Sequence, residues 1–286
     1  MKRSGLVVAV LVGCVAVSIL AAQSVDPNSL LEEADALFDR WTGTFDFDAY
    51  ESRLREAIRL YEEALPLLDP ADVTRQAHVL NRLAQAYFEL AQAYLTTDAD
   101  RKEAYKQGAD YALASLRLDA GFVAREANSF RDALSNARDV AAVFWYGNDF
   151  GCYLRYDLLR AFGGGTRDVV ACYERAIALD ETYLGGAPLR SLGCYSAQVP
   201  SFLGGDVKRA DELLRRAAEI DADYLENPVS LAQWVLEPTG DRAGACATLQ
   251  DVIARAADPE VMGAWPFYNE LSVRLARKLL TSYACP

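Results

Sequence analysis

The segment that decides the fold is 209-RADELLRRAAEID-221. Ala210, Leu214, Ala217 and Ile220 fall on one helical face, and Asp221 follows directly. The small residues let a neighbouring helix approach closely, and this order is typical of the second helix of a tetratricopeptide (TPR) repeat. The pattern returns, in weaker form in the second of these copies, in 52-SRLREAIRLYEEA-64, 107-QGADYALASLRLD-119 and 168-DVVACYERAIALD-180. Four copies favour a helical solenoid.

The remainder of the chain is rich in helix formers, and no stretch alternates at period two for long enough to indicate a sheet. Long, uneven insertions separate the repeats. We therefore predict an all-α, TPR-like helical-hairpin superhelix (an α-solenoid) with irregular insertions, as a single domain over residues 23–286. The predicted helices, about a dozen, are 29–41, 49–66, 72–95, 100–118, 122–135, 138–162, 166–179, 188–198, 206–220, 228–237, 241–257 and 264–283.

The N-terminus has the pattern of an export signal over residues 1–22. Lys2 and Arg3 precede an almost unbroken apolar run over 6–22. Within that run, 11-LVGC-14 is similar to a bacterial lipobox, which predicts cleavage before Cys14 and lipidation of its thiol. Cleavage near Ala22 and an uncleaved apolar anchor remain the alternatives. Each predicts a periplasmic protein, and two of the three predict membrane anchoring.

Charge and cysteine content narrow the classes of partner and site. With 41 acidic and 29 basic residues the net charge is −12, which disfavours nucleic acid as a partner. Five cysteines follow Cys14, and none has metal-ligand spacing. A disulfide between Cys152 and Cys172 is one interpretation, but we favour buried free thiols. The five are Cys152, Cys172, Cys194, Cys246 and Cys285.

The glycine pairs Gly185-Gly186 and Gly204-Gly205 raise the question of a phosphate-binding loop. A P-loop needs a Lys and a Ser or Thr where the following helix starts, whereas Asp206 and Val207 follow the second pair. An aspartate there repels phosphate and is a good N-cap. We therefore predict a turn and an N-cap without bound phosphate.

No residues of the chain form a recognisable catalytic or metal-binding set. His78 is the only histidine, so a zinc site or a Cys-His pair is improbable. Acidic pairs such as Glu32-Glu33 lie on charged helix faces. We predict no enzymatic activity, no cofactor and no metal.

An aromatic segment, 144-FWYGNDFGCYLRY-156, is the best candidate for a ligand site. Aromatic residues cover more than one face, so the helix is expected to be buried or to border a cavity. Plain core packing is the alternative, and an internal salt bridge is the alternative for Arg190. Four rings are expected to border an apolar passage: Trp145, Tyr146, Phe150 and Tyr153. Asn148 and Arg190 are the expected polar anchors, and Tyr195 is expected at the mouth of the passage.

Several motifs, in this order, resemble the T component of TRAP transporters, a family of periplasmic TPR lipoproteins. The match extends over nearly the whole chain that follows the export signal. The segments that carry it are 84-AQAYFELAQAYLTTDADRKEAYKQGADYALASLRLD-119, 144-FWYGNDFG-151, 184-LGGAPLRSLGCYSA-197, 198-QVPSFLGGDVKRADELLRRAAEID-221, 239-TGDRAGACATLQDVI-253 and 269-NELSVRLARKLL-280.

The resemblance implies a scaffold that works beside the solute-binding P component of a transporter for small organic acids or related ligands. It also implies a homo-oligomer, a trimer being one form, and a central passage for a small hydrophobic or carboxylate ligand. The alternative from the residues alone is a general envelope TPR adaptor lipoprotein that binds proteins or peptides in its groove.

Overall fold

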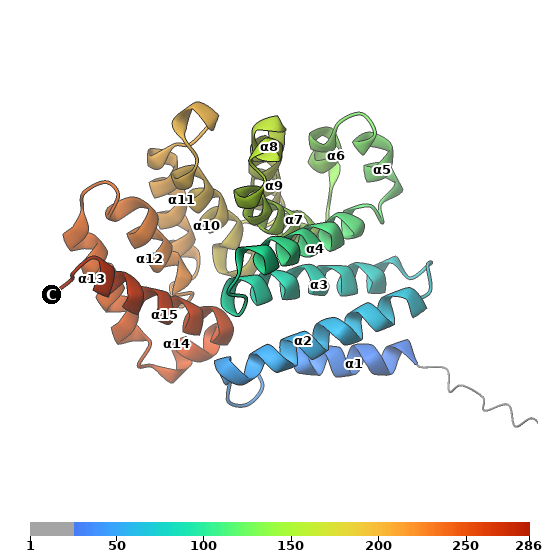
Figure 1. Cartoon of the computed structure of the whole chain (residues 1–286), viewed down its shortest axis with the longest axis horizontal. Coiled ribbons are helices and arrows are strands. Elements are labelled where there is room, and N and C mark those ends of the chain that lie inside the picture. Colours follow the sequence, from blue (N-terminus) through green and yellow to red (C-terminus); the bar gives the residue numbers. More distant parts are fainter. Residues whose placement is uncertain (1–25) are drawn as a thin grey trace, which may run out of the picture.

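The computed structural model describes residues 26–286, and every regular element in that range is helical. Figure 1 shows the helices stacked in a curved array. The α-helices are α1 (Pro27–Phe38), α2 (Phe47–Ala64), α3 (Val73–Ala93), α4 (Asp98–Leu116), α5 (Ala120–Glu126), α6 (Phe130–Asn136), α7 (Val140–Tyr153), α8 (Leu158–Arg160), α9 (Thr166–Leu179), α10 (Tyr183–Gln198), α11 (Val207–Ile220), α12 (Glu226–Leu231), α13 (Arg242–Arg255), α14 (Pro259–Ala264) and α15 (Pro266–Ser282). Short 3₁₀ or π turns cover Leu65–Leu67, Leu154–Tyr156, Ala161–Gly165, Ser201–Leu203 and Ala232–Leu236. The predicted all-α architecture is confirmed.

The repeat pattern of the sequence forms the contacts between paired helices. α1 packs on α2, α3 on α4, and α10 on α11, while α7 lies between α4 and α9 (Figure 1). A methyl group at Gly193 of α10 would lie 2.8 Å from Cγ of Leu214, so this glycine allows α11 to approach closely. The pattern positions that are buried are Ala57, Tyr61, Ala64, Gly108, Ala112, Ser115, Val169, Tyr173, Ala176, Ala210, Leu214 and Ala217.

The start of α2 and the segment that leads into α15 meet across the molecule and close the superhelix. The rings of Phe47 in α2 and Phe267 in α15 stack 5.6 Å apart. The indole N–H of Trp41 donates to the carbonyl oxygen of Ala264 at 3.0 Å. Figure 1 shows α14 and α15 beside the start of α2. The helices therefore surround a closed centre, in place of the open groove of an extended solenoid.

A buried polar cluster fixes this closure. Glu89 of α3 accepts a hydrogen bond from Tyr268 of α15 at 2.7 Å and another from Gln85 at 2.9 Å. Its second carboxylate oxygen pairs with Arg40, which follows α1. Arg40 also donates to the hydroxyl of Tyr50 in α2 at 3.2 Å. One carboxylate thus joins three parts of the fold that are far apart in sequence.

Two predicted helices are interrupted in the structure. The predicted helix 138–162 ends at Tyr153, because Asp157 accepts a hydrogen bond from the backbone N–H of Arg160 and starts a new turn. The predicted helix 122–135 is interrupted, since Ser129 accepts from the N–H of Asp132 and caps α6 separately. Short polar side chains next to the backbone compete with helix continuation in both places.

Gly185 and Gly186 form a non-helical kink at the start of α10, and Gly204 and Gly205 lie in the turn predicted before α11. Gly185 and Gly186 have φ values of 62° and 82°, and Gly204 has 97°, all in the left-handed region that favours glycine. Asp206 accepts from the backbone N–H of Arg209 at 3.0 Å and caps α11. A methyl group at Gly205 would lie 1.6 Å from the carbonyl oxygen of Val199, so a side chain does not fit there.

The free thiols favoured for Cys152 and Cys172 are confirmed, and Cys194 is free as well. Cys246 and Cys285, whose state the sequence did not predict, form a disulfide that joins α13 to the segment after α15. Their sequence separation of 39 residues gave no sign of this contact.

The predicted signal segment, including Cys14, lies outside the described residues. Within residues 26–286, no helix combines the length and the apolar character that a membrane span needs.

Candidate functional site

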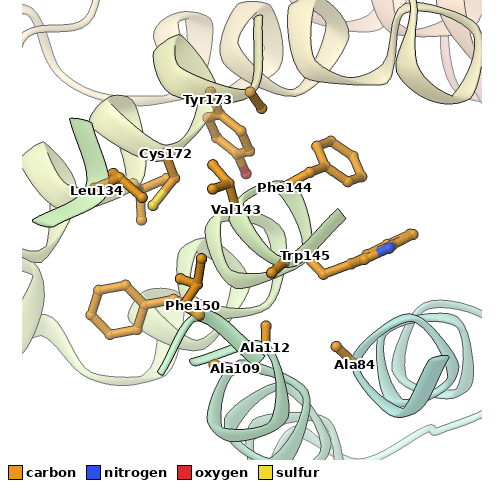
Figure 2. Packing of buried hydrophobic residues seen from close by; sticks show 14 of the residues in the cluster. Ala84, Ala109, Ala112, Leu134, Val143, Phe144, Trp145, Phe150, Cys172 and Tyr173 are labelled. Atoms are coloured by element: carbon orange, nitrogen blue, oxygen red, sulfur yellow. The ribbon is translucent and has the colours of Figure 1, made fainter. Parts of the chain in front are cut away.

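The candidate site is built around α7, the aromatic helix near the middle of the chain. Asp139 caps its N-terminus by accepting from the backbone N–H groups of Ala141 and Ala142. Methyl groups at Gly147 and Gly151 would lie 2.9 Å from Cys172 Cβ and 3.2 Å from Val169 Cγ1, respectively, so these two positions bring α9 close. Figure 2 shows the result: α9 side chains lie on one side of α7, and α4 alanines lie on the other. The expectation that α7 is covered on both faces is confirmed.

Three aromatic rings form a row along one side of α7. The rings of Tyr146 and Phe150 stack at 5.3 Å and 21°. Those of Phe150 and Tyr153 follow at 6.4 Å and 16°. Phe130 of α6 extends the row, with its ring 5.1 Å from that of Tyr146. Residues at i, i+4 and i+7 share a helix face, which is why the row is continuous.

This row borders a cavity of about 440 Å³. Its walls come from α4, α5, α6, α7, the start of α9 and the segment Leu158–Gly165. The lining residues are Lys106, Ala109, Asp110, Leu113, Glu126, Phe130, Tyr146, Phe150, Tyr153, Arg160, Gly163, Gly165 and Asp168.

The acidic side chains of this cavity all have a basic partner, whereas one of its basic side chains has no acidic partner in the described part of the chain. Its three acidic side chains each have a basic partner: Asp110 pairs with Lys106 at 2.9 Å, Glu126 with Arg117 at 2.8 Å, and Asp168 with Arg131 at 3.4 Å. Arg160 makes no ion pair within the described residues. Its guanidinium carbon lies 5.8 Å from the centre of the Tyr153 ring. Among the cavity's cations, Arg160 thus has a positive charge available for a ligand.

Four side chains that line this cavity, Lys106, Tyr146, Tyr153 and Asp168, have raised pKa values. Burial raises the pKa of Asp168 above its ordinary value, and the nearby Arg131 opposes this only in part. Burial, together with the hydrogen bond to Asp157, also raises the pKa of the Tyr153 hydroxyl, so Tyr153 stays neutral and donates to Asp157 at 2.9 Å.

Trp145, Asn148 and Arg190 do not join this row. They line a second cavity of only about 30 Å³ at the closed centre, together with Tyr224, Glu226 and other residues. A volume near that of one or two waters suits solvent and is too small for an organic acid. The structure therefore distributes the candidate residues over two cavities on different sides of α7.

Arg190 is held by internal partners. It donates to Asn227 at 2.8 Å and to the hydroxyl of Tyr224 at 3.2 Å, and it pairs with Glu226 at 3.1 Å. Burial is the largest single influence on the pKa of Arg190 and lowers it, but the charge of Glu226 together with Tyr224 and other neighbours outweighs burial and raises the pKa above its ordinary value. The internal salt bridge that the sequence left as the alternative is the one observed.

Tyr195 lines neither cavity. Its ring packs edge-on against Tyr173 of α9, with the centroids 6.2 Å apart. His78 is exposed, and its Nε2 lies 3.1 Å from a carboxylate oxygen of Asp35. Within residues 26–286, no group of three or more His, Cys, Asp or Glu side chains could hold a metal ion.

Sequence reasoning missed two features of the site. Asp149 is fully buried in α7, and neither carboxyl oxygen has a hydrogen-bond partner in the described part of the chain. An acidic residue inside the apolar run 144–153 was the available signal. It also missed the importance of Arg160, because only the folded chain brings residue 160 against the side of α7.

Comparisons with known proteins agree with this architecture. A family model described as "TRAP transporter T-component" matches residues 46–284. No curated protein is significantly similar in sequence. A solved structure of a thermophilic TPR protein from Thermus thermophilus is 17% identical, with a TM-score of 0.53 over 89% of this chain and 100% of that chain. At this identity the likeness shows the fold alone, and it confirms the TPR-like superhelix. The family match extends over most of the chain, and the protein therefore belongs to the TRAP transporter T-component family.

Proposed function

We propose that this chain is a non-catalytic periplasmic scaffold that docks the solute-binding P component of a TRAP transporter and holds a small organic acid. One observation carries the ligand part of the proposal, namely the cavity of about 440 Å³ beside the ring row of α7. The family match and the TPR-like fold support the scaffold part.

The cavity suits an acid with an apolar body. Its volume lies within the range of about 300–1,000 Å³ that is usual for small-molecule sites. Tyr146, Phe150 and Tyr153 offer stacked ring faces, while Arg160 offers a guanidinium that can form a bidentate contact with a carboxylate. The cavity's carboxylates already have basic partners, so they leave Arg160 to the ligand.

The disulfide supports an oxidising compartment. A bond between Cys246 and Cys285 is stable in the periplasm and rare in the cytosol. This agrees with the export signal expected over residues 1–22. Lipidation of Cys14 and assembly into a homo-oligomer, the trimer included, remain part of the proposal.

Docking is tested by native mass spectrometry of the purified chain with the P component of the same transporter. We expect a defined complex at micromolar concentration, and the same spectra give the oligomeric state of the chain alone. A chain that forms no complex with the P component, yet captures unrelated envelope proteins, would favour the general adaptor.

The ligand site is tested with a matched pair of probes, 3-phenylpropionate and the neutral 3-phenylpropanol, by calorimetry. We expect the acid to bind more tightly, and Arg160→Gln to weaken the acid about ten-fold, since a hydrogen bond to a charged group contributes about 1.5–3 kcal/mol. Arg155→Gln is the matched control, because this exposed arginine does not line the cavity. If Arg160→Gln and Arg155→Gln bound 3-phenylpropionate equally well, or if the parent chain bound 3-phenylpropanol more tightly than the acid, the assignment of Arg160 would be contradicted.

A further inference from the structure

The most exposed apolar side chains of the described residues gather at one end of the molecule. Nine large hydrophobic side chains are exposed in this part of the chain, and five of them belong to two neighbouring segments. The five are Leu158 (63% exposed), Leu159 (88%), Phe162 (61%), Phe202 (79%) and Val207 (42%). We call the two segments, Leu158–Gly165 and Ser201–Val207, the α8 edge.

The topology places both segments of the α8 edge at the same end of the molecule. α9 and α10 form a hairpin with a short connection, so the start of α9 and the end of α10 lie at the same end. The first segment immediately precedes α9, and the second follows α10. The ion pairs Arg209–Glu174 and Arg216–Glu181 show α11 running beside α9 in the same direction. In Figure 1, α8 and the loop before α11 both lie at the top.

The stretch 155–167, which contains the first segment of the α8 edge, is basic, although the chain as a whole has a net charge of −12. Arg155, Arg160 and Arg167 are exposed there, and none makes an ion pair with a described residue. Asp157 is the only acidic residue of this stretch, and its carboxylate is used by the Arg160 backbone N–H and the Tyr153 hydroxyl. In the second segment Asp206 is acidic and caps α11. The surface around the first segment therefore complements an anionic partner.

The shape of the α8 edge favours a bilayer over a protein partner. A methyl group at Gly163 or Gly204 would meet no atom within 4 Å, so the backbone here projects into open space. The exposed side chains of Leu159 and Phe202 stand on two separate protruding turns and line no described cavity. A lipid interface accepts such side chains without a matching surface, whereas a protein partner must be shaped to receive them.

We propose that the α8 edge rests on the surface of a membrane that contains anionic phospholipids. Leu158, Leu159, Phe162 and Phe202 enter the boundary between headgroups and acyl chains, and Arg155 and Arg167 lie among the phosphates. An apolar and basic surface patch adds to the membrane affinity of an anchor elsewhere in the chain. The α8 edge supplies a second signal beside the N-terminal segment. The inference rests on the proposed envelope location and does not depend on docking of the P component.

The test is flotation of the chain from Gln23 onward with vesicles of phosphatidylcholine alone or with about 30% phosphatidylglycerol, a probe composition chosen to supply anionic headgroups. This shortened chain keeps every buried hydrophobic cluster of the described residues, because the first residue of those clusters is Leu31. We expect binding about ten-fold stronger to the anionic vesicles, weakened by salt. The triple variant Leu158→Ser, Leu159→Ser, Phe162→Ser should reduce binding about ten-fold or more, since each apolar group withdrawn from the boundary weakens insertion.

Two further variants separate the contributions. The double variant Arg155→Gln, Arg167→Gln should weaken binding to anionic vesicles several-fold and leave binding to vesicles of phosphatidylcholine alone unchanged. Leu67→Ser with Val123→Ser is the matched control, because these exposed apolar residues lie elsewhere, and it should bind as the parent chain does. All variants should keep the parent melting temperature, since every altered side chain is exposed.

The proposal is overturned if the parent chain does not float with anionic vesicles or if the control loses as much binding as the triple variant. If the triple variant loses P-component binding in native mass spectrometry and keeps vesicle binding, the α8 edge is a protein interface. If P-component docking fails with every chain but vesicle binding follows the expected order, the proposed docking is wrong and the membrane contact stands.

Discussion

Asp149 is a carboxyl group in surroundings that do not favour its charge. It is fully buried between α7 and α4, and a methyl group at Gly108 would lie 2.5 Å from its Cγ. Neither oxygen accepts a hydrogen bond from a described residue. Burial therefore raises the pKa of Asp149 well above the ordinary value of 3.8. Gly108, the small residue at the start of the repeat pattern in 107–119, thus makes room for the side chain of Asp149.

We predict that Asp149→Asn reduces the loss of stability with rising pH. Because the folded pKa is raised, the folded state binds the proton more tightly, so the contribution of Asp149 to stability is greatest below pH 3.8 and falls as the pH rises towards the folded pKa. Each unit of pKa elevation corresponds to about 1.4 kcal/mol. Urea unfolding at several pH values from acid to mildly alkaline measures the slope.

The control for this prediction is Asp110→Asn, which changes an exposed carboxylate paired with Lys106. It should leave the slope almost unchanged. A slope for Asp149→Asn equal to that of the parent chain would show that Asp149 is ionised in the folded protein, and would contradict the raised pKa.

The candidate-site residues show where single-residue reasoning stops. A ring such as Trp145 or Tyr146 is predictably buried because of its apolar area. Which of two cavities it borders depends on the helix that covers it. Trp145 borders the closed centre with Arg190, whereas Tyr146 borders the larger cavity with Arg160.

At the scale of helices, local chemistry was the most predictable property. Each of many helices begins after a short acidic side chain that accepts from its first free N–H groups. This signal lies within four residues and needs no tertiary contact. The aspartates that cap in this way are Asp26, Asp46, Asp72, Asp119, Asp139, Asp157, Asp206, Asp241 and Asp258.

We predict that Asp206→Ala lowers the free energy of unfolding by about 0.5–2 kcal/mol, because α11 loses its N-cap. Lys208→Ala, an exposed change in the same first turn, should stay within about 0.5 kcal/mol of the parent chain. Thermal unfolding followed by circular dichroism measures both. Nucleotide binding that disappears with Asp206→Ala would mean that the turn is a phosphate site after all.

At the scale of the whole molecule, the Glu89 cluster decides whether the superhelix is open or closed. Its partners Arg40, Tyr50 and Tyr268 come from near both ends of the described chain. A buried ion pair adds little net stability compared with apolar packing, but it requires that all its partners be present. We infer that it fixes how α15 meets the N-terminal helices.

We predict that Glu89→Gln lowers the free energy of unfolding by about 3–5 kcal/mol, because it leaves the buried charge of Arg40 uncompensated. Asp48→Asn is the control, since it removes an exposed pair with Arg274 across the same closure and should cost only about 0–1 kcal/mol. Urea unfolding measures both. Similar losses in the two variants would show that the closure does not depend on the buried charge.

The sequence by itself determined the helical class, the TPR register, the glycine turns and the caps. Each of these depends on residues within one or two helical turns, where spacing alone sets which side chains share a face. Residues 168–180 and 209–221 carry that register without reference to the rest of the chain.

Only the tertiary structure decided the closure, the disulfide and the division of the site. Cys246 meets Cys285, and Glu89 meets Tyr268, across long stretches of sequence. Such contacts depend on the summed packing angles and insertion lengths of every helix between them, which no local spacing encodes. Arg160 reaches the ring row of α7 for the same reason: the chain folds back after Tyr153, and that reversal depends on what α7 packs against.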